Sequence, residues 1–296
     1  MAILELGEVR RSYDSEQALR GVSVSVEPGE VLGLVGRSGA GKTTLLRIAA
    51  GLLKADGGRV TVFGLDPWQH SVEVKRRLGY VAESQVVPPR LSTSALIDLH
   101  RDLYPSWDRE LERTLLGRLA IAPSKPIASL SKGEARKVLL LCAIAHRPEL
   151  LILDEPAGGL DPAARREFLE LSIELLANDG STILFSSHHM TDVERIASRL
   201  VLIERGEKVI DAELATFQQE HCVAVLPAPA PPAAERLRSV GGFVRSRARG
   251  SSLHAVFRRE PAELKSELHD RLQLSDVAIS RLSLEEMFVA FVGAES

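Results

Sequence analysis

The chain has 296 residues, of which 45% are hydrophobic and 26% are charged, and its formal net charge is −3. These values are typical of a soluble globular protein with one large domain, or one large and one small domain, and they give no overall field that favours nucleic acid. The longest apolar run is 138–145 and the only cysteines are Cys142 and Cys222, so we expect no membrane helix, disulfide framework or zinc pattern, as suits a reducing cytoplasm.

The N-terminal part of the chain is predicted to form strands. Valine alternates with serine over 22–26, which is typical of a strand with one buried face, and Pro28 and Gly29 supply a turn before 31–35. The strand-like runs are 3–9, 22–26, 31–35, 59–63 and 79–82. We therefore expect a β-rich region with a sheet that exposes one face.

Residues 36–43 match the phosphate-binding pattern G-x-x-x-x-G-K-[ST] without a mismatch. A strand-like run precedes the loop and a helix-like run, 43–50, follows it, so a glycine-rich turn without a ligand is the weaker interpretation. Glycines allow successive N–H groups to point at phosphate oxygens, Lys42 would reach the β- and γ-phosphates, and the Thr43 hydroxyl would hold Mg²⁺. The predicted nucleotide-binding residues here are Gly36, Arg37, Ser38, Gly39, Ala40, Gly41, Lys42, Thr43 and Thr44.

The pattern becomes helical after residue 93 and alternates between strand and helix after residue 150. Leu96, Leu99 and Leu103 are spaced three and four apart, which is typical of one face of a helix. Strands are then expected at 150–153, 182–186 and 200–203, and helices at 162–177 and 190–197. This order predicts a parallel sheet flanked by helices, with a helical insertion near 86–146.

Two carboxylates, Asp154 and Glu155, follow the apolar run 150–153, which is typical of a strand buried on both faces. Asp154 would hold Mg²⁺ beside Thr43, and Glu155 would orient or deprotonate the water that attacks the γ-phosphate. Two solvated acids that merely end a strand are the alternative, which the phosphate loop in the same chain disfavours.

Taken in order, these motifs make residues 1–215 resemble the nucleotide-binding domain of ABC transporters. Residues 36–43 are similar to the family's Walker A motif and 150–155 to its Walker B motif. Leu-Ser-Lys-Gly-Glu at 130–134 stands where the signature Leu-Ser-Gly-Gly-Gln belongs. The resemblance implies an α/β fold: a P-loop NTPase core with an antiparallel β subdomain and a helical insertion at 86–146.

The resemblance also implies roles in binding and hydrolysing ATP. Tyr13 would stack on adenine, although a hairpin-core aromatic is the alternative. Ser131 and Gly133 open a helix and would bind the ATP of a second subunit as an anion site. Asp161 matches the D-loop, and His188 matches a switch histidine that bonds the γ-phosphate and would be catalytic with Glu155, whereas a lone histidine is more often a polar loop residue. Each site would then be completed only in a head-to-tail homodimer.

The sequence departs from the family pattern at two places. The signature has Lys132 in place of Gly and Glu134 in place of Gln, and Glu83 stands where a Gln normally follows the strand. A carboxylate can still meet Mg²⁺ or its water, so we assign the position to Glu83 rather than to Gln85. The predicted magnesium ligands are Thr43, Glu83 and Asp154. These departures concern the rate of hydrolysis rather than the nucleotide site.

The C-terminal segment, 216–296, differs from the rest of the chain. The proline-rich stretch 227–232 marks a stiff break. We expect strand 221–226, helix 232–239, strands 243–247 and 252–258, helix 261–271, strand 275–280 and helix 283–292. This order resembles a small α+β ferredoxin-like accessory domain. The run 282–288 is similar to the tail of ATPase subunits of the ABC-2 export type.

Two further features allow a plain and a functional interpretation. Arg245, Arg247 and Arg249 alternate and would share one strand face, which is more simply solvated than in contact with anionic lipid or a partner. Trp107, in the helical insertion, is more simply a local core anchor than an exposed contact.

Together these observations predict an ATPase subunit of an ABC transporter, similar to ABC-2-type exporters, that uses ATP and Mg²⁺ to drive separate membrane permease subunits. We expect it at the cytoplasmic face of the cell membrane, attached through the permease, with no nucleic-acid partner. ABC ATPases that act on DNA or in translation usually carry long insertions or a second cassette, neither of which we find in this sequence. An ATP-binding sensor is the remaining alternative, which the altered signature leaves open.

Overall fold

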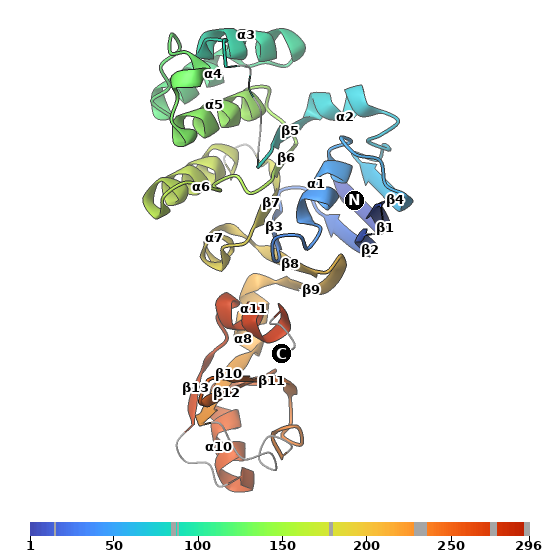
Figure 1. Cartoon of the computed structure of the whole chain (residues 1–296), viewed down its shortest axis with the longest axis vertical. Coiled ribbons are helices and arrows are strands. Elements are labelled where there is room, and N and C mark those ends of the chain that lie inside the picture. The colour runs from blue at the N-terminus through green and yellow to red at the C-terminus, as the bar shows by residue number, and fades with distance from the viewer. Residues whose placement is uncertain are drawn as a thin grey trace. The chain divides into compact units, whose positions relative to one another are not determined.

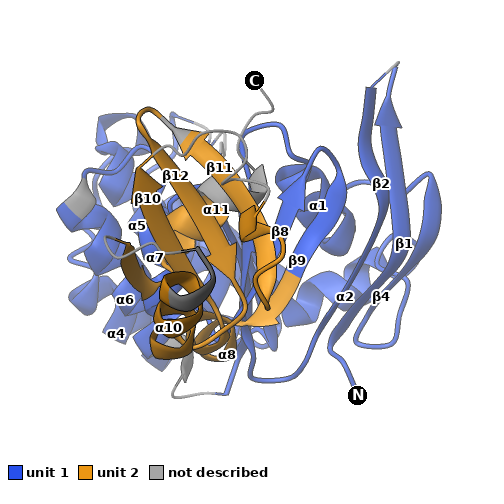
Figure 2. Ribbon diagram, turned by 90° about the horizontal axis from the view of Figure 1, so that it is seen from below, with its two compact units in different colours: residues 1–210 blue, residues 211–296 orange. Residues whose placement is uncertain are grey.

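The computed structural model describes residues 1–14, 16–83, 87, 89–177, 180–227, 236–272 and 277–292. The chain divides into two compact units, Met1–Ile210 and Asp211–Ser296, which are coloured separately in Figure 2. Each unit has its own hydrophobic core. Within the described residues, no helix combines the length and the apolar character needed to cross a membrane.

The first unit begins with an antiparallel sheet in the order β2-β1-β4, formed by β1 (Leu4–Tyr13), β2 (Glu16–Val26) and β4 (Gly57–Val62). Val22, Val24 and Val26 are buried, whereas the two serines between them are partly exposed. Alternate side chains of a strand point to opposite faces, so the alternating pattern gives one face in the core and one toward solvent. The predicted antiparallel β subdomain is confirmed.

A second sheet carries the strand that precedes the glycine-rich loop, together with strands from later in the chain. Its order is β5 (Leu78–Val81), β6 (Leu150–Leu153), β7 (Thr182–Ser187), β3 (Val31–Val35), β8 (Arg199–Glu204) and β9 (Glu207–Glu213). The pairs from β5 to β8 are parallel, and every residue of β6 and β7 is buried. Because parallel strands end at the same edge, the residues after β3, β5, β6 and β7 gather there. Helices α1 (Lys42–Ala49), α6 (Pro162–Ala177) and α7 (Met190–Ile196) accompany this sheet (Figure 1), as the sequence predicts.

A group of helices interrupts the sheet between β5 and β6. Helix α2 (Ser71–Arg77) precedes β5, and α3 (Thr93–Leu103), α4 (Arg109–Arg118) and α5 (Lys132–Ile144) follow it and lie together in Figure 1. The residues from Val138 to Ile144 are all buried, which explains why this part of α5 is apolar without a polar face. The predicted helical insertion is confirmed.

Trp107 is an internal anchor of these helices. Its Nε1 atom donates to Oε2 of Glu112 at 2.7 Å, and Arg101 donates to both oxygens of the same carboxylate at 2.7 and 3.0 Å. The Glu112 residue is only 8% exposed. A carboxylate at such a place is stable only when its hydrogen bonds are made, so Trp107 and Arg101 hold Glu112 between α3 and α4.

The Glu112→Ala variant is expected to lower the free energy of unfolding by about 3 kcal/mol, because Arg101 and the indole N–H lose their partly buried acceptor. Urea unfolding followed by tryptophan fluorescence measures the loss. The control is Glu110→Ala on the exposed side of the same helix, for which a change within about 0.5 kcal/mol is expected. Equal losses in the two variants would contradict the anchor.

The second unit contains an antiparallel sheet in the order β11-β12-β10-β13, formed by β10 (Cys222–Pro227), β11 (Phe243–Arg249), β12 (Ser252–Phe257) and β13 (Ala278–Arg281). Helix α10 (Pro261–Leu272) connects β12 to β13, and α8 (Leu214–Glu220) and α11 (Leu284–Val292) flank the sheet in sequence. This strand order is that of a ferredoxin-like sheet, as predicted. Half of the predicted helix 232–239 lies outside the described residues, as do the first two residues of the predicted strand 275–280, the rest of which overlaps β13.

The two faces of this sheet differ. Cys222, Ala224 and Leu226 of β10 share a core with Leu264 and Leu268 of α10, so this cysteine packs as a small apolar residue. On the other face, the arginines of β11 alternate as the sequence predicts. Their paired residues on β12 are Val256 for Arg245, His254 for Arg247 and Ser252 for Arg249.

Candidate functional site

The phosphate-binding loop connects β3 to α1, the strand–loop–helix arrangement that its sequence requires. Gly41 has a φ of +106°, and a Cβ atom there would lie 2.5 Å from the Ala18 carbonyl oxygen, so only glycine fits. The next residue, Lys42, is 6% exposed and donates from Nζ to the Gly36 carbonyl at 2.8 Å and to the Arg37 carbonyl at 3.2 Å. The ammonium group is therefore held over the loop, where phosphate oxygens would bind.

Asp154 lies directly beside Thr43 at the carboxyl end of β6. Its Oδ1 atom accepts hydrogen bonds from the Thr43 hydroxyl at 3.0 Å and from the Ser186 hydroxyl at 2.9 Å. Its Oδ2 atom is buried and has no hydrogen-bond partner among the described residues. Burial raises the pKa of Asp154, although the two hydroxyls oppose that shift. A buried carboxylate oxygen left without a donor is a place for a cation.

Glu155 is held between a cation and an imidazole. Its Oε2 atom lies 2.8 Å from Nδ1 of His188, and its Oε1 atom lies 3.4 Å from Nζ of Lys42. The residue is 7% exposed, has a φ of +45°, and donates its backbone N–H to the Ser186 hydroxyl at 2.8 Å. These contacts fix the Glu155 carboxylate beside the phosphate-binding loop. The sequence-predicted residues Glu155 and His188, 33 positions apart in sequence, meet there.

His189 differs from its neighbour. Its ring lies 4.0 Å from the His188 ring, and burial lowers its pKa, so the neutral form is favoured. Its backbone N–H donates to the Ser187 hydroxyl at 3.0 Å, just before α7 begins. These contacts give His189 a structural place.

One cavity of about 420 Å³ joins the predicted nucleotide residues. Tyr13, which is 43% exposed, lies on its wall together with Glu83, Glu155 and His188. The remaining lining residues are Glu16, Ala18, Arg37, Ser38, Gly39, Gly41, Lys42, Thr43 and Thr44. Sequence reasoning missed Glu16 and Ala18, because neither belongs to a local pattern. Ala40 and Gly36 belong to the loop without lining the cavity.

Ser131, Gly133 and Asp161 do not line this cavity within the chain that the structure describes. Ser131 caps α5 in a capping box: its Oγ atom accepts from the Glu134 N–H at 3.2 Å, and its own N–H donates to Glu134 Oε2 at 2.7 Å. Asp161 accepts the N–H groups of Ala163 and Ala164 at the start of α6. These residues therefore do not complete the nucleotide site of their own chain.

The capping box gives Glu134 a local purpose. Its carboxylate also accepts from Lys125 Nζ at 2.8 Å, and the hydrogen bonds from Lys125 and Ser131 lower the pKa of Glu134 to about 2. A glutamate at this position therefore stays ionised and stabilises the start of the helix. The pattern Ser-x-x-Glu is the sequence signal for such a cap.

Glu83 follows β5 and reaches the nucleotide cavity, and its charge contributes to the raised pKa of Asp154. Gln85 lies outside the described residues. The assignment of the metal position to Glu83 stays a prediction.

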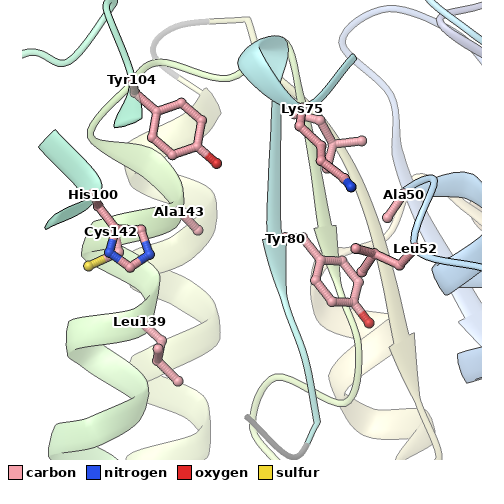
Figure 3. Close-up of a pocket in the computed structure, with 10 residues that line it drawn as sticks. Ala50, Leu52, Lys75, Tyr80, His100, Tyr104, Leu139, Cys142 and Ala143 are labelled. Atoms are coloured by element: carbon pink, nitrogen blue, oxygen red, sulfur yellow. The ribbon is translucent and has the colours of Figure 1, made fainter. Parts of the chain in front are cut away.

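A second cavity of about 200 Å³ lies in the same unit, between the helical insertion and the sheet (Figure 3). His100, Tyr104, Leu139, Cys142 and Ala143 line one side of it, and Ala50, Leu52, Lys75 and Tyr80 line the other. Leu78 is the remaining lining residue. Burial raises the pKa of Tyr80 to about 12 and the pKa of Cys142 to about 12, so both side chains stay neutral.

A glycine-rich loop after a buried parallel strand, a carboxylate pair at the end of a neighbouring strand and a shared cavity define a P-loop nucleoside triphosphatase. Residues 19–158 match the ABC transporter family. The chain is 31% identical over 219 residues to the ABC transporter ATP-binding protein YtrB of Bacillus subtilis (strain 168), which covers 74% of this chain and 75% of YtrB. It therefore belongs to the ATP-binding proteins of ABC transporters, and it binds and hydrolyses ATP.

Other relatives agree. The chain is 34% identical over 213 residues to the Nod factor export ATP-binding protein I of Sinorhizobium fredii (strain NBRC 101917 / NGR234), covering 70% of this chain and 62% of that protein. A solved ATP-binding subunit of an ABC transporter superposes with a TM-score of 0.66 at 29% identity, over 73% of this chain and 92% of the other. The cassette MJ0796, solved as a dimer bound to ADP and Pi, superposes with a TM-score of 0.64 at 22% identity, over 71% and 98% of the two chains. That last likeness concerns the fold alone.

Proposed function

We propose that this ATPase works as a head-to-tail homodimer around two Mg-ATP and drives a separate membrane permease in an exporter of the ABC-2 type. The observation that carries the proposal is the Glu155 carboxylate, held at the phosphate loop by Lys42 and His188. The subunit would lie at the cytoplasmic face of the cell membrane, attached through the permease, and would need no nucleic-acid partner.

Magnesium fits the oxygen donors at the end of β6. The buried Asp154 Oδ2 atom has no partner among the described residues, and the Thr43 hydroxyl lies beside it. Mg²⁺ is usually bound in such sites by one or two carboxylates together with substrate phosphates. Thr43, Asp154 and Glu83 would hold the ion, and the ion would neutralise charge on the phosphate oxygens.

Different residues of the chain would have different roles in hydrolysis. The loop N–H groups and Lys42 would bind the β- and γ-phosphates and stabilise the charge that develops on them. Glu155 would accept the proton of the attacking water, and His188, bonded to Glu155 Oε2, would orient that carboxylate and bond the γ-phosphate. Low exposure of Lys42 and Glu155 strengthens these interactions, because water screens them less.

Residues that do not line the nucleotide cavity support the homodimer. Ser131 and Gly133 stand at the amino end of α5, where helix N–H groups favour an anion, yet the nucleotide of their own chain would bind elsewhere. A second copy that presents its own α5 would complete the site.

The permease is supported by the cavity between the helical insertion and the sheet. Leu99 and Leu103 of α3 and Leu52 are exposed, and Leu103 and His100 are neighbours on one side of the helix. Exposed apolar residues around a cavity are typical of a protein contact. The relative that is named for export, and the tail 282–288, support the ABC-2 export type.

The Leu52→Arg and Leu103→Arg variants test the permease contact. Each is expected to reduce, by about tenfold or more, copurification with the proposed membrane permease, because a charge replaces an apolar contact. Basal ATPase activity should stay within about twofold, since neither residue lines the nucleotide cavity. The control is Val209→Arg, at another exposed apolar residue of the first unit. Unchanged copurification in both test variants would reject this docking surface.

A further inference from the structure

Arg136 joins the signature helix to the end of strand β5. It lies in α5, and its Nη1 atom donates to the Ala82 carbonyl at 2.9 Å while its Nη2 atom donates to the Glu83 carbonyl. Both acceptors are main-chain atoms directly after β5. A planar guanidinium that donates to two successive carbonyls fixes their relative direction, and with it the backbone from which the Glu83 side chain projects.

The charge of Arg136 faces the acidic edge of the sheet. Glu83, Asp154 and Glu155 each raise the pKa of Arg136, while its burial is the larger effect and lowers that pKa. Asp154 belongs to the same edge, since its N–H donates to the Val81 carbonyl at 2.8 Å. In the part of the chain that the structure describes, the guanidinium donates to carbonyls and not to these carboxylates, so the buried Oδ2 atom of Asp154 stays without a donor.

The contact of Arg136 with the Ala82 and Glu83 carbonyls also links the chain segments that lead into and out of the helical insertion. The chain enters the insertion after Glu83 and returns through α5, which begins at the Ser131 cap. Arg136 therefore connects the two ends of this insertion. Along α5, it lies little more than one helical turn after the signature residues. A displacement of Glu83 would pull on the helix that carries Ser131.

We propose that Arg136 is a positioning residue of ATP hydrolysis: it directs the Glu83 carboxylate to the divalent cation of the bound nucleotide and ties that point to the signature helix. The proposal deepens the proposed function, because it rests on the assignment of Glu83 to the magnesium site. It gives Arg136 a role in metal affinity that a purely architectural contact would not have.

The test is Arg136→Gln in the full chain, with Mn²⁺ as the metal and a non-hydrolysable ATP analogue as the nucleotide. Electron paramagnetic resonance is expected to show Mn²⁺ affinity weakened by about tenfold, as is usual when a residue that orients a metal ligand is lost. The Mg²⁺ concentration for half-maximal ATPase activity should rise by the same factor. Binding of the analogue in EDTA should stay within about twofold, because the phosphate loop and Lys42 are unchanged.

Arg136→Lys separates position from charge. Lysine keeps the positive charge but presents one nitrogen in place of the fork, so most of the loss in Mn²⁺ affinity is expected to remain. A role through charge alone predicts the opposite sign for Arg136→Gln, namely tighter Mn²⁺ binding, because a cation beside the carboxylates has been removed. Wild-type affinity in Arg136→Lys, or tighter binding in Arg136→Gln, would overturn the proposal.

Two controls make the result specific. Lys137→Gln removes one positive charge from the next position of the helix, where the ammonium pairs with Glu167 at 3.3 Å, and it should leave Mn²⁺ affinity unchanged. Glu83→Ala removes the ligand oxygens and should weaken Mn²⁺ binding itself, and adding Arg136→Gln to it should cause little further loss, since both act through one side chain. If Glu83→Ala binds Mn²⁺ like the wild type, the magnesium assignment fails. If Glu83→Ala weakens Mn²⁺ binding but Arg136→Gln does not, the positioning role fails and the assignment stands.

Discussion

The Glu155→Gln variant is expected to bind ATP and dimerise while its turnover falls by about a thousandfold, because the amide cannot accept the proton of the attacking water. Gln has nearly the same shape as Glu and can occupy the same backbone conformation, with φ at +45°. Steady-state phosphate release measures the turnover, and gel filtration with ATP measures the dimer.

The matched control is Glu149→Gln, at the other end of the same strand region. Glu149 pairs with Arg77 on the surface, with an Nε–Oε1 distance of 2.5 Å, and has no place in the nucleotide cavity. Its turnover should stay within about twofold of the wild type. If wild type and Glu155→Gln both showed the same negligible turnover, even with the permease present, the motor function would be wrong and an ATP-binding sensor would be favoured.

Mixing two inactive variants is expected to restore hydrolysis. Lys42→Ala lacks the phosphate contact of its own loop, and Ser131→Arg blocks the site that its helix would offer to a partner. In a mixed dimer, one site combines the intact phosphate loop of the Ser131→Arg chain with the intact signature of the Lys42→Ala chain. Half of the dimers in an equal mixture are mixed, so about a quarter of the wild-type activity should return if the two sites work independently.

The separate variants are the controls for this experiment, and each alone should be nearly inactive. Activity in the Ser131→Arg protein by itself would mean that the signature helix has no part in the site. No recovery on mixing, with both variants shown to bind each other, would contradict a head-to-tail arrangement in which each nucleotide contacts two chains.

The parts of the site that follow local patterns could be predicted from the sequence. The phosphate loop, Asp154 and Glu155 each depend on a few consecutive residues at the end of a buried strand, and parallel pairing brings those strand ends to one edge. The family resemblance placed His188 and Tyr13, and both line the nucleotide cavity.

Other contacts depend on tertiary structure that no local pattern contains. Glu16 and Ala18 line the cavity only because the antiparallel sheet lies against the loop, as the close approach of the Ala18 carbonyl to Gly41 requires. The bonds from Arg136 to the end of β5 join residues more than fifty positions apart. Glu134 shows the opposite case: the capping pattern with Ser131 was readable, although comparison with the family signature made it look like a mere departure.

The pairing of Lys42 with Glu155 links substrate binding to the carboxylate in the nucleotide-free chain. The two side chains lie 3.4 Å apart with little exposure, so each has an oppositely charged partner before a ligand arrives. An incoming phosphate group would compete with Glu155 for the same ammonium. A phosphate that takes the ammonium would leave the carboxylate with its contact to His188 alone. The arrival of ATP and the release of Glu155 from Lys42 would then be a single exchange of partners.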